Sequence, residues 1–194
     1  MTARRAIFLD RDGTINVNRA DHVKNLDEFV LLPGALAAIQ RLAQTPLAII
    51  LISNQSVINR GLASVQTVQA INQHLADAIH ATGGRLDAIY ICPHTPDEEC
   101  ACRKPRPGLL LQAQQEHDLN LAGSYLVGDA VTDVELAEAV GCRPVFVLTG
   151  RGAAHHSKLT ALQLRHTYIA HNLDEAATWI LKKEEQHTVG APTR

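Results

Sequence analysis

Ala6-Ile-Phe-Leu-Asp-Arg-Asp-Gly-Thr14 is the stretch that decides the fold, because four apolar residues run directly into two aspartates one residue apart. The run 6–9 is apolar throughout rather than alternating, which is typical of a strand covered on both faces in a parallel α/β sheet. Such sheets place their chemistry at the carboxyl ends of the strands, where Asp10 and Asp12 would lie. Gly13 would let the chain turn away sharply at that point.

Two other interpretations of this stretch must be weighed. A solvated turn after a strand is common and fits the Asp-Gly sequence, so it stays open from these residues alone. An EF-hand calcium loop needs a third acidic or amide residue before its glycine and a glutamate at loop position 12. Here Gly13 comes too early and Asp21 holds the last position, which argues against a calcium loop.

The composition fits one domain with its own core. A length of 194 residues with 46% hydrophobic and 20% charged residues is ordinary for a soluble globular domain. The net charge of -2 and the pI near 6.5 argue against a nucleic-acid surface, which is normally basic. Residues 1–5 are too short and polar to begin a signal peptide, and no stretch approaches the ~20 apolar residues of a membrane span. We therefore expect a cytoplasmic monomer without nucleic-acid or membrane partners, with one domain over 1–182 and a flexible tail over 183–194.

Apolar patterns along the chain alternate between strands and helices. Apolar runs predict strands at residues 6–9, 47–52, 86–91, 125–127 and 144–148, with a short edge strand at 168–169. Helical spacing and capping residues predict helices over 33–42, 64–82, 107–117, 132–140 and 172–181. Loops are expected at 15–32, a candidate lid, and at 150–157. The alternation predicts an α/β fold with a single doubly wound parallel sheet and right-handed crossovers.

Polar clusters follow four of the predicted strands. The clusters are Asp10 with Asp12, Ser53 with Asn54, Arg103 with Lys104, and Asp129 with Asp133. Each cluster alone is explained by a turn, a helix cap or a solvated charge. Because the carboxyl ends of parallel strands meet at one edge of the sheet, the four clusters would converge. Carboxylates together with a lysine and hydroxyl or amide groups make a site that can hold Mg²⁺ and a phosphate.

These segments, taken in chain order, also resemble a known set of motifs. Asp10-Arg-Asp-Gly-Thr14, Ser53-Asn-Gln55, Lys104 and Gly128-Asp-Ala-Val-Thr-Asp133 resemble the four signatures of the haloacid dehalogenase superfamily of phosphatases. The resemblance spans residues 6 to about 150. It implies a Rossmann-like fold and Mg²⁺-dependent hydrolysis of phosphate monoesters.

The resemblance also assigns roles to particular residues. Asp10 would attack phosphorus to give an aspartyl-phosphate, and Asp12 would protonate the leaving alkoxide and then deprotonate the hydrolytic water. Mg²⁺ would be bound by Asp10, the main-chain carbonyl of Asp12, and Asp129. Lys104 and Ser53 would stabilise charge on the phosphoryl oxygens.

A second cluster of metal ligands lies between the third strand and Lys104. Cys92, His94, Cys100 and Cys102 offer three thiolates and one imidazole, the composition of a closed structural zinc site. Free cysteines are often simply small buried hydrophobes, but the segment that joins these residues carries three acidic side chains and is too polar for a core. Cys142 lies far from the cluster, and we assign it no function.

The cysteine cluster narrows the resemblance within the superfamily. Cys92-Pro-His94 followed by Cys100-Ala-Cys102-Arg-Lys-Pro105 resembles the branch of D-glycero-D-manno-heptose 1,7-bisphosphate phosphatases and histidinol-phosphatases, where zinc ties down the loop that carries the catalytic lysine. That branch implies a zinc-stabilised loop, no large cap domain, and a small phosphorylated sugar as substrate. The 7-phosphate of the heptose bisphosphate is favoured, with histidinol phosphate or another sugar phosphate as the alternative. The departures from the heptose pattern are Val57, Asn59 and Ala130.

Loops would shape the pocket in the absence of a cap. The predicted substrate contacts are Asn18, Arg19, Asp21, Asn54, Gln55, Arg60 and Arg103. The arginines suit a second phosphate. Two non-enzymatic alternatives remain: a receiver-like domain that only accepts a phosphoryl group, and a zinc-stabilised binding module. A receiver has its acidic pair side by side and no cysteine loop, and a binding module leaves the aspartates unexplained.

Overall fold

The computed structural model describes residues 3–162 and 167–189. In that part of the chain six parallel strands form one sheet in the order β3-β2-β1-β4-β5-β6. The strands are β1 (Ala6–Leu9), β2 (Ala48–Asn54), β3 (Ala88–Cys92), β4 (Tyr125–Gly128), β5 (Arg143–Val147) and β6 (Tyr168–Ala170). The strand order reverses between β1 and β4, so the carboxyl ends of these two strands form the switch point where open α/β sheets bind ligands.

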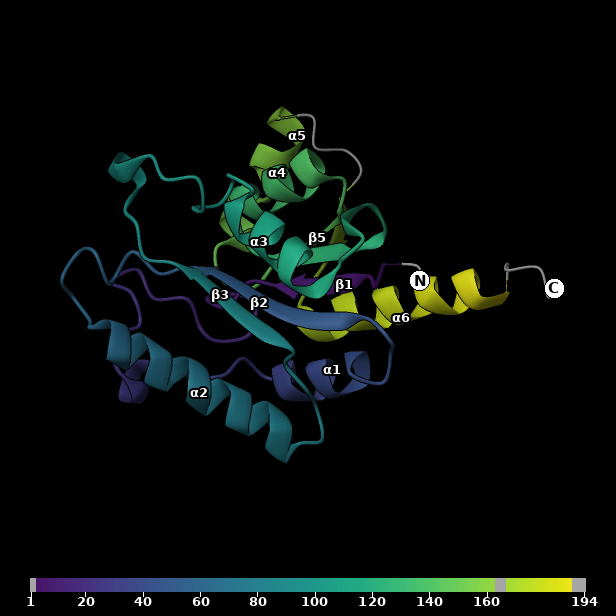
Figure 1. The fold of residues 1–194 in the computed structure, drawn as a ribbon, viewed down its shortest axis with the longest axis horizontal. Helices are drawn as coiled ribbons and strands as arrows, with labels where there is room; N and C mark the ends of the chain where they lie inside the picture. The colour runs from purple at the N-terminus through teal and green to yellow at the C-terminus, as the bar shows by residue number, and fades with distance from the viewer. Residues whose placement is uncertain (1–2, 163–166, 190–194) are drawn as a thin grey trace.

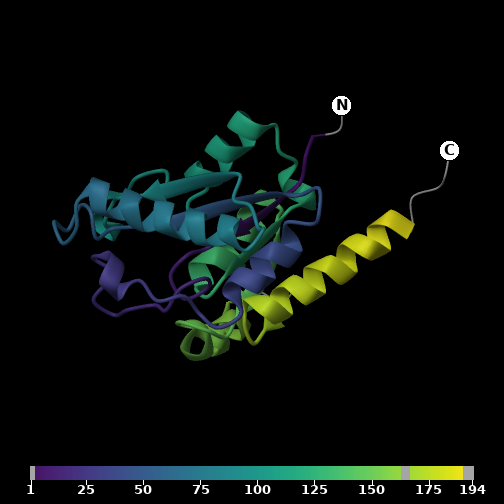
Figure 2. The same ribbon diagram turned by 90° about the horizontal axis from the view of Figure 1, so that it is seen from below.

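Helices cover both faces of the sheet, as the sequence predicts (Figure 1). One face carries α1 (Ala35–Leu42), α2 (Val65–Ala81) and α6 (Leu173–Val189), and the other carries α3 (Gly108–His117), α4 (Val131–Val140) and α5 (Gly152–Ala161). Figure 2, which views the molecule from below, shows α1 and α6 side by side. In β1, Ile7 and Leu9 pack on the α1 and α6 side while Ala6 and Phe8 pack on the α3 and α4 side. All four side chains are fully buried, which explains why the run does not alternate.

Long loops leave the carboxyl ends of the strands, at the left of Figure 1. Residues 15–32 form a folded-back loop with one short 3₁₀ turn, in which the Val17 N–H donates to Val30 O at 2.8 Å. Residues 93–107 form the second long loop, which carries the cysteine cluster. Within the described residues no inserted cap domain interrupts the sheet, so these loops border the site.

The predicted strands and helices are confirmed, apart from one loop and the end of the last helix. Ser64 caps α2 as expected, and its hydroxyl accepts from the Thr67 N–H at 3.0 Å. The loop predicted at 150–157 is wrong, because α5 begins at Gly152. That helix packs through Leu159 against Val134 and Phe146. A single buried leucine gives no helical periodicity, and the packing partners lie on other elements.

The predicted flexible tail also needs correction. The last helix, α6, continues past Leu181 to Val189. Glu184 forms an ion pair with Arg5 and accepts from the Tyr125 hydroxyl at 2.8 Å, so tertiary contacts fix this polar turn. Residues 190–194, the end of the predicted tail, lie outside the described residues. Among the described helices, none has the length and apolar character needed to cross a bilayer.

Candidate active site

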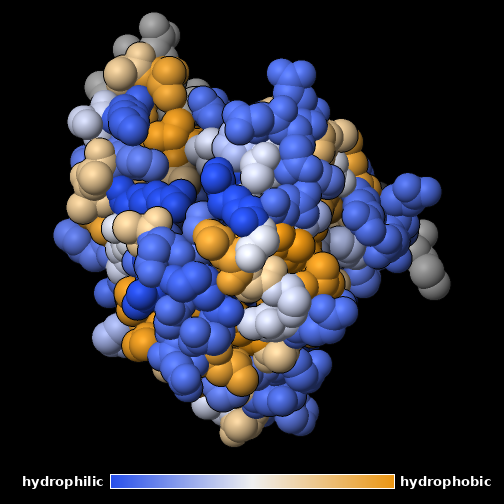
Figure 3. All heavy atoms as spheres, turned by 90° about the vertical axis from the view of Figure 1, so that its left-hand side faces the viewer, coloured by the Kyte–Doolittle hydropathy of each residue, from blue (hydrophilic) through white to orange (hydrophobic). Residues whose placement is uncertain are grey.

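A cavity of about 560 Å³ opens at the carboxyl ends of β1, β2 and β4. It lies between the 15–32 loop and the cysteine loop, and it contains the four polar clusters that the sequence predicted would converge. Figure 3 shows this side of the molecule, where strongly hydrophilic side chains gather near the middle of the face.

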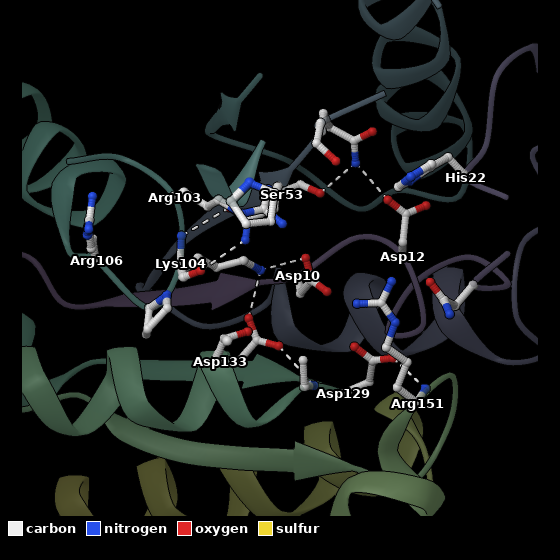
Figure 4. Close-up of a pocket in the computed structure, with 18 of the residues that line it drawn as sticks. Asp10, Asp12, His22, Ser53, Arg103, Lys104, Arg106, Asp129, Asp133 and Arg151 are labelled. Atoms are coloured by element: carbon white, nitrogen blue, oxygen red, sulfur yellow. Dashed lines mark hydrogen bonds and ion pairs between the residues drawn. The ribbon is translucent and has the colours of Figure 1, made fainter. Parts of the chain in front are cut away.

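Lys104 lies at the centre of the site (Figure 4). Its ammonium nitrogen is 2.7 Å from Asp10 Oδ1 and 2.7 Å from Asp133 Oδ1, and it also donates to Ile52 O at 3.2 Å. Burial alone would lower the pKa of Lys104, but the two carboxylates raise it above its ordinary value. The lysine is therefore held as a buried cation beside Asp10.

Asp12 is held in place by three donors. Its carboxylate accepts from Gln55 Nε2 at 2.6 Å, from Asn16 Nδ2 at 2.9 Å and from the Arg11 guanidinium at 3.0 Å. Burial raises the pKa of Asp12, but the Arg11 charge and these hydrogen bonds outweigh burial and hold the pKa below its ordinary value. Gln55 Nε2 also donates to Ser53 Oγ at 2.7 Å, so one amide links two of the predicted catalytic residues.

Three carboxylates fit a divalent cation. Oxygen atoms of Asp10, Asp129 and Asp133 lie within 4.8 Å of one another, with Lys104 as the buried positive charge among them. Burial, followed by mutual repulsion, raises the pKa of Asp129 to about 8, and burial raises that of Asp10 to about 6 despite Lys104. Lys104 is a single positive charge beside three carboxylates, and Mg²⁺ would supply further positive charge to their oxygens.

Two glycines let backbone approach Asp129. A Cβ at Gly13 or at Gly150 would collide with the Asp129 carboxylate, and both glycines have positive φ, 95° and 56°. Thr149 Oγ1 donates to Gly13 O at 2.6 Å, and the Arg151 N–H donates to Asp129 Oδ2 at 2.6 Å. The loop after β5 is thereby fastened to the first motif.

The four predicted zinc ligands lie together, and one of them, Cys100, lines the cavity. Sulfur-to-sulfur distances among Cys92, Cys100 and Cys102 are 3.1 to 3.6 Å, and His94 Nδ1 lies 3.2 Å from Cys102 Sγ. Tetrahedral zinc with Zn–S bonds of about 2.3 Å separates its sulfur ligands by about 3.8 Å, so a small outward movement would fit the ion. Cys142 is buried elsewhere in the core.

The cysteine loop holds its arginines through main-chain carbonyls. Arg103 donates to His94 O at 2.9 Å, and Arg106 donates to Cys100 O at 2.9 Å. Both arginines line the cavity. The cysteine loop thus positions two guanidinium groups as well as Lys104.

The structure places five of the seven predicted substrate contacts at the cavity: Asn18, Arg19, Asn54, Gln55 and Arg103. Asp21 does not line the cavity: its side chain is 61% exposed, and it pairs with Lys24 at 2.6 Å and with the lining residue Arg19 at 3.2 Å, so its contact with substrate stays a prediction. Arg60 does not line the cavity either: it is exposed and donates to Ser56 Oγ at 3.4 Å, so its contact with substrate also stays a prediction. Loop residues next to a motif do not all face the cavity, and only the folded structure decides which of them face it.

The cavity residues that escaped the sequence analysis include His22, Arg106, Thr132 and Arg151. Arg151 follows the fifth strand, so the expectation that polar residues at the carboxyl ends of strands converge could have found it. Arg106 lies two residues after Lys104 and could have been included with it. His22 has no comparable sequence pattern, since the conformation of the 15–32 loop alone brings it to the cavity.

Comparisons with known proteins agree with this geometry. Residues 101–176 match a family model described as HAD-hydrolase-like. The D-glycero-beta-D-manno-heptose-1,7-bisphosphate 7-phosphatase of Pseudomonas aeruginosa is 41% identical over 150 residues, which are 77% of this chain and 84% of that protein. The enzyme of the same name from Bordetella bronchiseptica is 44% identical over 148 residues, 76% of this chain and 83% of that protein.

A solved structure is similar over nearly the whole chain. The D,D-heptose 1,7-bisphosphate phosphatase from B. bronchiseptica, complexed with magnesium and phosphate, superposes with a TM-score of 0.86 at 39% identity, covering 92% of this chain and 99% of that one. The chain therefore belongs to the haloacid dehalogenase-like hydrolases, in the group of the D-glycero-beta-D-manno-heptose-1,7-bisphosphate 7-phosphatases.

Proposed function

We propose that this protein is a Mg²⁺-dependent phosphatase that removes the 7-phosphate of D-glycero-beta-D-manno-heptose 1,7-bisphosphate. The observation that carries the proposal is the buried contact of 2.7 Å between Lys104 Nζ and Asp10 Oδ1 at the switch point of the sheet. Relatives that carry this enzyme name, at 41% and 44% identity, support the substrate.

Asp10 is the proposed nucleophile. Lys104 holds its Oδ1, so Oδ2 is the oxygen assigned to attack phosphorus. A new O–P bond forms, the bond between phosphorus and the sugar oxygen breaks, and the leaving alkoxide takes a proton from Asp12. Water then attacks the aspartyl-phosphate while Asp12 accepts its proton, which regenerates Asp10 and releases phosphate. Lys104 and Ser53 stabilise the charge on the phosphoryl oxygens.

The proton on Asp12 is linked to substrate binding. Arg11, Asn16 and Gln55 favour its ionised form in the site without substrate. A phosphoryl dianion placed beside the carboxylate raises its proton affinity. Asp12 can therefore gain its proton as the substrate binds and return to the ionised form when phosphate leaves.

Two metal ions complete the proposal. Asp10, Asp129 and the main-chain carbonyl of Asp12 would hold Mg²⁺. When bound, Mg²⁺ supplies the positive charge that reduces repulsion between the nucleophile and the phosphate dianion. Cys92, His94, Cys100 and Cys102 would hold structural Zn²⁺. Those four residues fix the loop from which Arg103 and Lys104 reach the cavity.

We assign substrate binding to the cavity residues whose side chains do not hold a catalytic residue in place. Asn18, Arg19 and Arg103 line the cavity and would contact the sugar and its second phosphate. Asn54 and Gln55 also line it, but their amides bind Lys104 and Asp12, so we assign them mainly to positioning.

We also propose that the enzyme works as a monomer in the cytoplasm. Every group in the mechanism comes from one chain, and a reducing compartment keeps the thiols available for zinc. Sedimentation equilibrium of the purified protein tests the monomer, and fractionation of its cells tests the compartment.

A substrate panel tests the function. The purified enzyme with Mg²⁺ should hydrolyse the heptose 1,7-bisphosphate with a kcat/KM at least tenfold above those for histidinol phosphate and fructose 1,6-bisphosphate. Positional analysis of the product should find phosphate retained at carbon 1. A preference for histidinol phosphate would replace the proposed substrate, and formation of a stable phosphoprotein without turnover would favour a receiver-like protein.

A further inference from the structure

Among the residues that the structure describes, Arg11 is the largest fully buried side chain, and the mechanism above gives it no chemical step. Its exposed fraction is 0%, and it does not line the cavity. A buried cation is costly unless it is paired and hydrogen-bonded. Its partners should therefore reveal what it does.

The guanidinium of Arg11 joins four segments of the chain. NH2 donates to Asp12 Oδ2 at 3.0 Å and Oδ1 at 3.2 Å, and to Gln55 Oε1 at 2.9 Å. NH1 donates to Asn72 Oδ1 at 2.9 Å, in the middle of α2. The Phe29 ring of the 15–32 loop lies 6.0 Å from the guanidinium carbon.

The surroundings leave the guanidinium little freedom. Asn72 is 5% exposed, and its oxygen accepts from the arginine nitrogen that does not touch Asp12. Phe29 is 8% exposed and in turn packs edge-to-face against His74 of α2, with ring centroids 6.1 Å apart. Helix α2 therefore fixes the guanidinium directly through Asn72 and indirectly through the ring of Phe29.

We propose that Arg11, anchored by Asn72, is a positioning residue that fixes the orientation of the Asp12 carboxylate for proton transfer. A general acid must lie within hydrogen-bond reach of the leaving oxygen, and an error of about 1 Å can cost about a hundredfold in rate. Arg11 binds both carboxylate oxygens, so loss of its anchor on α2 would turn the carboxylate rather than remove it. This inference rests on the proposed role of Asp12.

Asn72 gives the sharpest variants, because Arg11→Met leaves a buried carboxylate without its cation and can fail to fold. Asn72→Leu keeps the volume and removes the oxygen, and we expect kcat for the sugar bisphosphate to fall about tenfold with KM nearly unchanged. Asn72→Asp restores an acceptor oxygen and should recover most of the loss. Gln73→Ala is the matched control on the same helix, since Gln73 contacts only the exposed Asp77, at 2.8 Å, in the described hydrogen bonds.

Two readouts separate positioning from a general structural defect. An activated aryl phosphate needs little protonation of its leaving group, so Asn72→Leu should slow its hydrolysis less than that of the sugar bisphosphate. In an Asp12→Asn background, Asn72→Leu should cause no further loss, because both changes act on the same proton transfer. Circular dichroism and thermal unfolding confirm that each variant is folded.

The outcomes distinguish the inference from the function on which it rests. Asp12→Asn with wild-type turnover of the sugar bisphosphate overturns the proposed mechanism itself. If Asp12→Asn is impaired but Asn72→Leu is folded and fully active, only the positioning role fails. Equal loss from Asn72→Leu with both substrates, or additive loss in the Asp12→Asn background, also overturns it.

Discussion

Asn54 binds the main chain of Lys104 with both ends of its amide. Nδ2 donates to Lys104 O at 3.2 Å, and Oδ1 accepts from the Lys104 N–H at 3.1 Å. The last residue of β2 thus fixes the backbone of a lysine that lies 50 residues later in the chain. The lysine ammonium consequently meets Asp10 from a loop that has no secondary structure of its own at that point.

Asn54→Ala should lower kcat about tenfold while KM changes little. The variant loses both hydrogen bonds to the Lys104 main chain, so Lys104 moves relative to Asp10. Asn59→Ala is the matched control, since Asn59 is exposed and contacts Glu98 at the outer end of the same loop, at 2.7 Å. Steady-state kinetics of both variants check the prediction. A normal kcat for Asn54→Ala would show that these two hydrogen bonds are not needed to position Lys104.

Asp10→Asn should reduce hydrolysis to less than about 1% of the wild-type rate, because an amide cannot form the phosphoryl-enzyme. Substrate can still bind, since the cavity keeps its arginines. Release of inorganic phosphate measures the first effect, and isothermal titration calorimetry measures the second. More than a few per cent residual activity would exclude Asp10 as the nucleophile.

Asp12→Asn should slow hydrolysis of the sugar bisphosphate by about a hundredfold or more, because leaving-group protonation is lost. The loss should be smaller for an activated aryl phosphate, whose leaving group needs little protonation. The ratio of kcat/KM values for the two substrates is the measurement. An equal loss for both substrates would contradict the assignment of Asp12 as the general acid.

The two metals should differ in how tightly they bind. Dialysis against EDTA should remove activity that Mg²⁺ alone restores, while about one zinc per chain stays bound, because a closed thiolate site holds its ion tightly. Elemental analysis before and after dialysis checks this. Absence of zinc in the purified wild type contradicts the site.

The double substitution Cys100→Ser with Cys102→Ser isolates the role of zinc. It should release the ion and lower kcat while the sheet stays folded, because the loop, and not the core, depends on the metal. Full turnover without zinc would show that the ion is not needed to position Lys104.

The metal-free protein should become less stable as the pH rises from about 4 to about 8. Burial raises the folded-state pKa of Asp10 to about 6 and of Asp129 to about 8, from an ordinary value of 3.8. In this range the folded state binds more protons than the unfolded state, so the free energy of unfolding falls with rising pH.

Added Mg²⁺ should therefore raise the melting temperature more at pH 8 than at pH 5. At pH 8 more of the Asp10 and Asp129 carboxylates are ionised, and Mg²⁺ offsets their repulsion. Scanning calorimetry at the two pH values makes the comparison. An equal Mg²⁺ effect at both pH values would rule out this electrostatic account.

The local sequence was sufficient to predict those helices, strands and metal-ligand clusters whose pattern lies within a short stretch of the chain. The four apolar residues before Asp10 predicted a strand buried on both faces, and all four are fully buried. Ser64 predicted the start of α2 because a cap acts over three residues. The grouping of Cys92, His94, Cys100 and Cys102 was predicted because three thiolates and an imidazole at this spacing are typical of a zinc site.

Only the tertiary structure decided which polar side chains meet and which face solvent. It excluded Asp21 and Arg60 from the cavity, added Arg106 and Arg151, and buried Arg11 between Asp12 and Asn72. The helix at 152–161 and the last turns of α6 formed where the sequence predicted loop and tail, because their stabilising contacts come from distant elements. Periodicity and spacing report the surroundings of a residue along the chain, whereas burial and ion pairing depend on strands and helices that are tens of residues away in sequence.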